Sequence, residues 1–197
     1  METLKAIEKR NSVRRFLEIP IKHSDLTKIL KAGSQAPTSA NIITTSITVV
    51  TKKEKKEQIA NACLNQTWIT QAPIVLVLCS DIESIKDIYK NRAELYATQN
   101  AAVTAQNILI AATDLDIGSC FVSAFTNSPL QKALELPKHI KPQVVIPLGY
   151  SDDKKTKKKR ERLQNMIFFE KYGKKTKSSI FPLKKHKNKI KKLIKKI

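Results

Sequence analysis

The chain has 197 residues and a formal net charge of +20, with 27% charged and 41% hydrophobic residues. This size and composition suit one globular domain and exclude a disordered chain, a collagen-like repeat and a membrane protein. Residues 1–151 hold 18 basic and 13 acidic side chains, a net +5, whereas residues 152–197 hold 19 and 4, a net +15. The positive charge therefore belongs mainly to the C-terminal part of the chain.

The three cysteines, Cys63, Cys79 and Cys120, lie far apart and form no Cys-x-x-Cys pair. Neither a disulfide framework nor a structural zinc site is expected, and Cys63 and Cys120 are expected to be small core residues. The N-terminus has no apolar signal segment, and the longest apolar run, 73–79, is far shorter than the ~20 residues that span a bilayer. The sequence therefore predicts a cytoplasmic protein.

Hydrophobic periodicity predicts helices and strands that alternate along the chain. The expected helices are 2–10 with Leu4, Ala6 and Ile7 on one side, a second capped by Ser24 or Asp25 and closed by Gly33, then 53–64, about 92–115, and 128–135 with Ser128 as N-cap. The expected strands are 46–51, 74–79, 119–122 and 144–148, the second of them buried on both faces, and 36–41 is a turn. Such mixing predicts a layered α+β or α/β domain.

Beyond Tyr150 the composition becomes polar and basic. Residues 174–197 contain 11 lysines and no acidic residue, and their apolar positions have the spacing of a basic amphipathic helix. We therefore expect a domain over 1–173 and a lysine-rich tail over 174–197. Binding of nucleic acid or an anionic membrane surface through this tail is one alternative function.

The sequence contains no arrangement typical of nucleophilic catalysis, of a metal site, or of a Rossmann or P-loop nucleotide site. His23, His139 and His186 stand in polar surroundings and are expected to be surface side chains. What remains is a candidate anion site near the N-terminus. In an extended chain Arg10, Ser12 and Arg14 share one face and offer two guanidinium forks and a hydroxyl to a phosphate, although a solvated basic edge has the same pattern.

Residues 9–16, with the sequence Lys-Arg-Asn-Ser-Val-Arg-Arg-Phe, resemble the opening signature of the nitroreductase-like flavoproteins. Further segments resemble that family in the same order. They are the turn at 36–41, the helix-to-strand step at 65–73, the alanine-rich helix at 99–112, the strand and loop at 118–125, Leu136-Pro137, 146–150 and Arg160. Together these segments span most of the chain.

The resemblance implies an α+β sheet-and-helix fold and an intertwined homodimer with one FMN in each of two interface sites. Carried over residue by residue, the FMN phosphate would be held by Arg10, Ser12, Arg14 and Arg160, with Asn11 beside them and Lys158 as a helper. The ring and ribityl chain would be lined by Pro37, Thr38, Ser39 and Asn41 of the partner subunit. Asn65 would face the pyrimidine edge, while Val122, Ser123 and Ala124 would pass under the ring, with the Ser123 N–H directed at flavin N5.

The resemblance also implies ping-pong electron transfer from NADH or NADPH through FMN to a nitroaromatic, a quinone or a similar electron-poor acceptor. Flavin N5 would be the reactive centre, so no catalytic side chain is expected. A second alternative is an FMN protein with a specialised reaction, such as dehalogenation or a biosynthetic oxidation.

The chain departs from the family pattern at three places. Ile42-Ile43-Thr44-Thr45 follows Asn41 where the family turn usually continues through Gln-Pro-Trp, Asp116 stands in place of the first glycine of a pair before Ser119, and Thr38 replaces the usual serine. These changes bear on substrate choice and turn geometry, whereas the expected phosphate residues are intact.

Overall fold

The computed structural model describes residues 2–153 and 163–175. The chain divides into two compact units, residues 1–155 and 156–197, each of which is described by itself. The first unit is a mixed helix and sheet domain, so the predicted α+β class is confirmed. Within the described residues, no helix is both long and apolar enough to cross a membrane.

A four-stranded antiparallel sheet forms the centre of the first unit, in the order β1-β2-β4-β3. Its strands are β1 (Thr45–Val50), β2 (Ile74–Asp81), β3 (Gly118–Ser119) and β4 (Ile140–Gly149). β4 begins four residues before the predicted start, and it pairs with β2 through a register shift at Leu78/Cys79. β3 is shorter than predicted, because only Val122 continues the pairing, as an isolated bridge to Val145.

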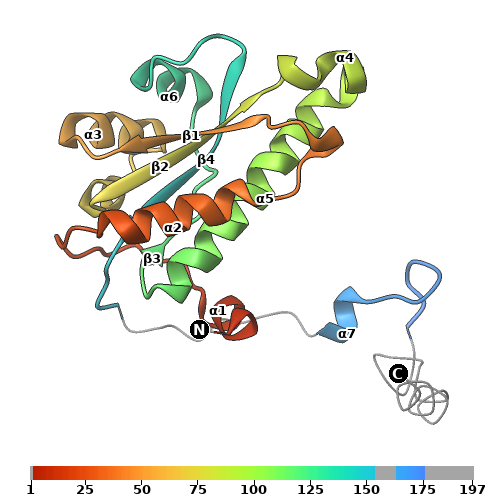
Figure 1. The fold of residues 1–197 in the computed structure, drawn as a ribbon, viewed down its shortest axis with the longest axis horizontal. Coiled ribbons are helices and arrows are strands. Elements are labelled where there is room, and N and C mark those ends of the chain that lie inside the picture. The colour runs from red at the N-terminus through yellow and green to blue at the C-terminus, as the bar shows by residue number, and fades with distance from the viewer. Residues whose placement is uncertain (1, 154–162, 176–197) are drawn as a thin grey trace. The chain divides into compact units, whose positions relative to one another are not determined.

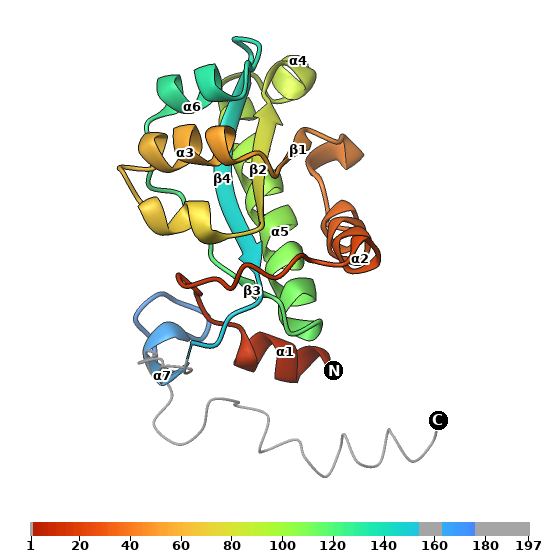
Figure 2. The same ribbon diagram turned by 90° about the vertical axis from the view of Figure 1, so that its left-hand side faces the viewer.

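The five predicted helices are present in the predicted order, and the short helix Lys86–Tyr89 is an additional one. The helices of the first unit surround this sheet. They are α1 (Thr3–Lys9), α2 (His23–Ser34), α3 (Lys53–Ala62), α4 (Lys86–Tyr89), α5 (Ala93–Asp114) and α6 (Asn127–Ala133), with 3₁₀ turns η1 (Ser39–Asn41), η2 (Thr67–Gln71), η3 (Glu83–Ile85) and η4 (Lys90–Arg92). Two helical layers enclose the sheet, with α3 and α6 on one side and α5 and α2 on the other (Figures 1 and 2).

Strand β2 explains this layering through its alternating side chains. Val75 and Val77 belong to the core that includes α3 and α6, whereas Leu76 and Leu78 belong to the core of α5 and α2. All four are fully buried, so the prediction of a strand buried on both faces is confirmed. The central strand thus anchors both layers.

The predicted first helix is present, and on it only Ala6 is buried, while Leu4 is 74% exposed and Ile7 39% exposed. Two local predictions are wrong. Gly33 does not close α2 but lies within it, where a Cβ would approach Ile108 Cγ1 to 2.9 Å. This glycine therefore permits the close contact of α2 with α5.

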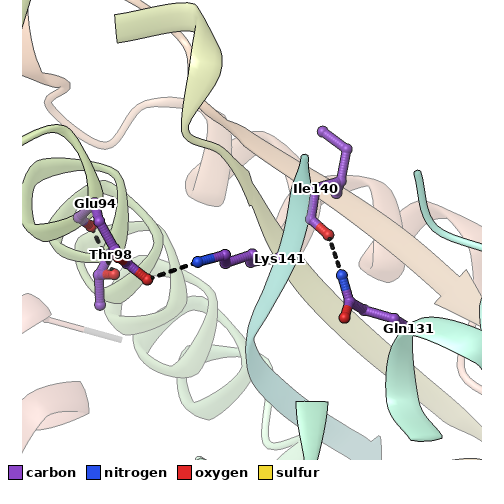
Figure 3. A network of polar contacts seen from close by, with 5 residues as sticks. All are labelled: Glu94, Thr98, Gln131, Ile140 and Lys141. Atoms are coloured by element: carbon purple, nitrogen blue, oxygen red, sulfur yellow. Dashed lines mark hydrogen bonds and ion pairs between the residues drawn. The ribbon is translucent and has the colours of Figure 1, made fainter. Parts of the chain in front are cut away.

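The second wrong prediction concerns the start of α6. The flanking residue is Thr126 rather than Ser128, and it makes no side-chain cap. Gln131, expected near the cap, instead donates through Nε2 to the Ile140 carbonyl at 3.0 Å. The adjacent Lys141 donates to Glu94 Oε1 of α5 at 3.0 Å, so neighbouring residues of β4 are tied to opposite helical layers (Figure 3).

The described part of the second unit is short. It contains α7 (Leu163–Met166) and a turn in which Phe168 and Tyr172 have ring centroids 4.7 Å apart. Apart from Lys174 and Lys175, the predicted lysine-rich tail lies outside the described residues.

Gly149 gives a direct test of the packing at the β3 end of the sheet. A Cβ at this position would lie 2.6 Å from Pro73 Cδ and 2.9 Å from Phe16 Cδ1. Because two rings would have to move, Gly149→Ala should lower the free energy of unfolding in urea by about 1–3 kcal/mol. Ser46→Ala, at an exposed position of β1, should change it by less than about 0.5 kcal/mol. Equal stability of the two variants would contradict this packing.

Candidate functional site

The segment that follows α1 runs along the sheet edge as an extended chain. Ser12 forms a parallel bridge with Ser119, and the Val13 N–H donates to the Ser119 carbonyl at 3.0 Å. Val13 is buried, whereas Ser12 and Arg14 are exposed. The alternation expected from the sequence is therefore present, with Val13 packed inward and its two neighbours facing out.

Arg10, Ser12 and Arg14 all lie near the thiol of Cys120. Burial raises the pKa of Cys120, and this effect exceeds the lowering by Arg14, by a hydrogen bond with Ser12 and by Arg10. Two guanidinium groups and a hydroxyl therefore lie near the end of the sheet where Ser12 bridges Ser119.

The other two cysteines have no such surroundings. Burial alone raises the pKa of Cys63 and of Cys79 to about 12, so both are neutral thiols. Both are fully buried, as is Cys120, which confirms that Cys63 and Cys120 are core residues.

Arg14 also has an aromatic support. Its guanidinium carbon lies 5.8 Å from the centroid of the Trp68 ring, and Phe16 stacks on the same ring at 6.4 Å. A cation held over an aromatic face loses little further freedom when it binds an anion. Trp68 is half-buried against the core, so its role here is packing and support.

Asn11 lines a pocket of about 90 Å³ together with Val13, Lys9 and Asp116. Lys9 forms an ion pair with Asp116, which has a φ of 56°. The residue that replaces the expected glycine thus adopts a left-handed conformation, and the turn into β3 is retained.

Two loops beyond Cys120 are joined by a glutamine. Gln66 Nε2 donates to the Cys63 carbonyl at 2.9 Å and to the Ala124 carbonyl at 3.4 Å. The Thr126 N–H donates to the Ala62 carbonyl at 2.9 Å, which strengthens the same connection. The loop of Asn65 and the loop of residues 122–124 are therefore held side by side.

Within these loops, Asn65, Ser123 and Ala124 are exposed, while Val122 is buried by its bridge to Val145. Asn65 has a φ of 58°, as does Leu64, so the loop is sharply bent. In the part of the chain that the structure describes, the Ser123 N–H has no hydrogen-bond partner. It is an exposed backbone donor at a fixed place.

The turn at 37–41 is held by a buried asparagine of α5. Asn100 Oδ1 accepts from the Ser39 N–H at 3.0 Å and from Ser39 Oγ at 3.1 Å, while its Nδ2 donates to Thr44 Oγ1 at 3.0 Å. Ala40 and Asn41 have φ values of 52° and 57°. The unusual Thr44 thus provides an anchor, so the turn remains ordered without the Gln-Pro-Trp of the family pattern.

The structure does not bring this turn to the arginine cluster. Ser119, at the cluster, pairs with Leu148, whereas Thr44 accepts from the Asp81 N–H at the far end of β2. At ~3.3 Å per residue, the length of β2 separates the two ends by roughly 23 Å. A single chain therefore carries the two parts of the expected site at opposite ends of its sheet.

Two useful residues were not predicted from the sequence. Asn100 interrupts the alanine stripe of α5, and a polar side chain on a buried stripe is a signal that an anchor is needed. Gln66 carries no such signal. Lys158 and Arg160 lie outside the described residues, so their expected place at the phosphate stays a prediction.

The model of the nitroreductase family matches residues 7–73 and 63–150. An FMN reductase [NAD(P)H] from Bacillus subtilis is 28% identical over 173 residues, which cover 81% of this chain and 70% of that protein. An NADPH-flavin oxidoreductase from Vibrio harveyi is 28% identical over 158 residues, covering 76% of this chain and 66% of that protein. The crystal structure of nitroreductase A from Vibrio parahaemolyticus superposes with a TM-score of 0.80 at 26% identity, covering 86% of this chain and 76% of that one.

Asn100→Ala tests how the 37–41 turn is held. The substitution removes the one oxygen that accepts both hydrogen bonds from Ser39 and leaves the buried Thr44 hydroxyl without its donor, which should cost about 2–4 kcal/mol. Hydrogen exchange at the Ser39 amide should become faster. Asn107→Ala is the matched control, since Asn107 lies on the same helix and donates to Ala32 instead. Unchanged exchange at Ser39 in the Asn100 variant would show that the turn is held by other contacts.

Proposed function

The chain belongs to the nitroreductase family, and we propose that it is an FMN-dependent oxidoreductase that passes electrons from NADH or NADPH to an electron-poor small molecule. The observation that carries the proposal is the extended segment after α1, which the Ser12–Ser119 bridge holds with Ser12 and Arg14 exposed and with Arg10 and Arg14 near Cys120. A doubly charged phosphate is the group that two guanidinium forks and a hydroxyl bind best.

The residues present fit FMN in their donor chemistry. Besides the arginine cluster, the exposed Ser123 N–H offers a donor without a partner among the described residues, on a loop that is fixed to the loop of Asn65. When bound, FMN supplies the hydride-accepting and electron-donating chemistry, for which amino acid side chains have no equivalent.

The chain's own residues have binding and positioning roles in this proposal. Arg10, Ser12 and Arg14 bind the phosphate, the segment of Val122, Ser123 and Ala124 passes under the ring, and the loop of Asn65 borders its polar edge. The Ser123 N–H donates a hydrogen bond to the ring and fixes its orientation. Fixed hydrogen-bond donors and positive charge would stabilise the additional negative charge of a reduced flavin.

We infer a homodimer because the arginine cluster and the 37–41 turn lie at opposite ends of one chain's sheet. The 37–41 turn lies too far from the arginine cluster of its own chain to line the same ligand, whereas the turn of a second chain has no such restriction. In this dimer Pro37, Thr38, Ser39 and Asn41 complete the partner's site. The exposed Leu4 and Ile7 of α1 offer apolar surface for the association.

The acceptor class is a nitroaromatic, a quinone or a similar planar, electron-poor molecule, as the nitroreductase family name and the flavin reductase relatives suggest. We place the protein in the cytoplasm, where its three free cysteines would stay reduced.

Colour and bleaching test the function directly. The purified protein should be yellow, with the flavin absorbance bands, and should bleach when NADH or NADPH is added without oxygen. A colourless protein that FMN does not reconstitute would contradict the proposal. Bound FMN that neither donor reduces would favour a specialised flavin reaction instead.

Arg14→Ala tests the phosphate site. Loss of a charge-assisted hydrogen bond worth about 1.5–3 kcal/mol should weaken FMN binding about 10- to 150-fold, as measured by flavin fluorescence titration. Arg15→Ala is the matched control, because Arg15 is the next residue and lies 3.9 Å from Asp153 through an exposed contact. It should bind FMN like the unchanged protein. Equal affinities of the two variants would place the phosphate elsewhere.

A further inference from the structure

A short helical segment between β2 and α5 holds an arginine on an aromatic surface. The rings of Tyr89 and Tyr96 meet edge to face with centroids 4.5 Å apart. The guanidinium carbon of Arg92 lies 5.2 Å from the centroid of Tyr96. Both tyrosines are half-buried, so the support under Arg92 is fixed.

The charge of Arg92 is not neutralised within the described residues. No carboxylate there forms an ion pair with it, and the nearby Glu94 pairs with Lys141 instead (Figure 3). Lys86 and Lys90 are exposed on the same short segment. An arginine that is stacked on an aromatic ring and not paired with a carboxylate is suited to bind a phosphate through two parallel hydrogen bonds from its guanidinium group.

The backbone fixes this arrangement further. Lys90 has a φ of 47° between α4 and η4, a conformation that persists only where surrounding contacts maintain it. The contacts come from the small core of Ile85, Ala93 and Ala97, against which both tyrosines pack.

This cluster adjoins the turn that completes the proposed flavin site. Ile42 directly follows Asn41 and packs against the same small core as the two tyrosines. A nicotinamide that lies over the flavin ring must extend its adenosine and phosphate groups beyond the rim of the site. The tyrosine–arginine cluster, Tyr89, Arg92 and Tyr96, supplies a cation and aromatic surface next to that turn.

We propose that Arg92, supported by Tyr96, binds a phosphate of the adenosine half of the nicotinamide donor. This inference rests on the proposed function. Two phosphates have the required chemistry: the pyrophosphate, which NADH and NADPH share, and the 2′-phosphate, which only NADPH carries. Arg92 is a binding residue for the donor and has no part in holding FMN.

The test compares Arg92→Gln with the control Lys132→Gln. The control removes the same charge from an exposed position of α6, on the other side of the sheet. Calorimetry with adenosine 2′,5′-bisphosphate, which carries no nicotinamide, measures binding without any redox reaction. Arg92→Gln should weaken this binding about tenfold, the order expected for one exposed charge-assisted hydrogen bond, and Lys132→Gln should not.

The donor concentration for half-maximal anaerobic bleaching then identifies the phosphate. A rise of about tenfold for NADPH alone assigns Arg92 to the 2′-phosphate, and an equal rise for both donors assigns it to the pyrophosphate. The inference would be overturned if the Arg92 and Lys132 variants agreed within about twofold in two respects. These are their affinity for the bisphosphate and the concentrations of NADH and of NADPH that give half-maximal bleaching.

These outcomes are separable from failure of the proposed function. FMN content and bleaching by dithionite, which needs no nucleotide site, should be the same in both variants. A protein without flavin would defeat the proposed function, whereas a flavin-loaded protein with unaltered nucleotide binding in Arg92→Gln would defeat only the inference. Tyr96→Leu should weaken bisphosphate binding and Tyr96→Phe should preserve it, because only the ring supports Arg92.

Discussion

The pairing of the N-terminal segment with β3 is the interaction on which the proposed site depends. The bridge from Ser12 to Ser119 and the Val13 hydrogen bond hold the segment extended. An extended chain must alternate its side chains, so burying Val13 turns Ser12 and Arg14 outward together. If this segment were detached from β3, nothing would hold the two guanidinium groups near each other against their mutual repulsion.

The second constraint is the length of the sheet. β2 runs the full distance from the arginine cluster to the turn that Asn100 holds, and its side chains are committed to the cores on both faces. The chain therefore has no means of bringing its own turn to its own cluster. The proposed homodimer would solve this geometrical problem, because each site would take its phosphate end from one subunit and its ring-lining turn from the other.

Much of this could be predicted from the sequence, because periodicity reports which side of an element is buried. The apolar run of β2, the long α5 and the alternation after Arg10 were predictable for that reason. The close contact at Gly33, the exposure of Leu4 and the missing cap of α6 were not, since each depends on what lies opposite in three dimensions. Asn100 accepts a hydrogen bond from Ser39, which lies 61 positions earlier in the chain, and no local sequence pattern predicts such a contact.

The most direct measurement of the central claim uses mixed dimers. One chain carries Arg10→Ala and Arg14→Ala, the other carries Pro37→Trp, and each variant alone should lose FMN. In a mixed dimer of the two, one site receives both defects and the other receives none. Equal mixing should therefore restore about a quarter of the wild-type FMN content. No restoration, with mixed dimers shown to form, would mean that each site lies within one chain, and would contradict the account.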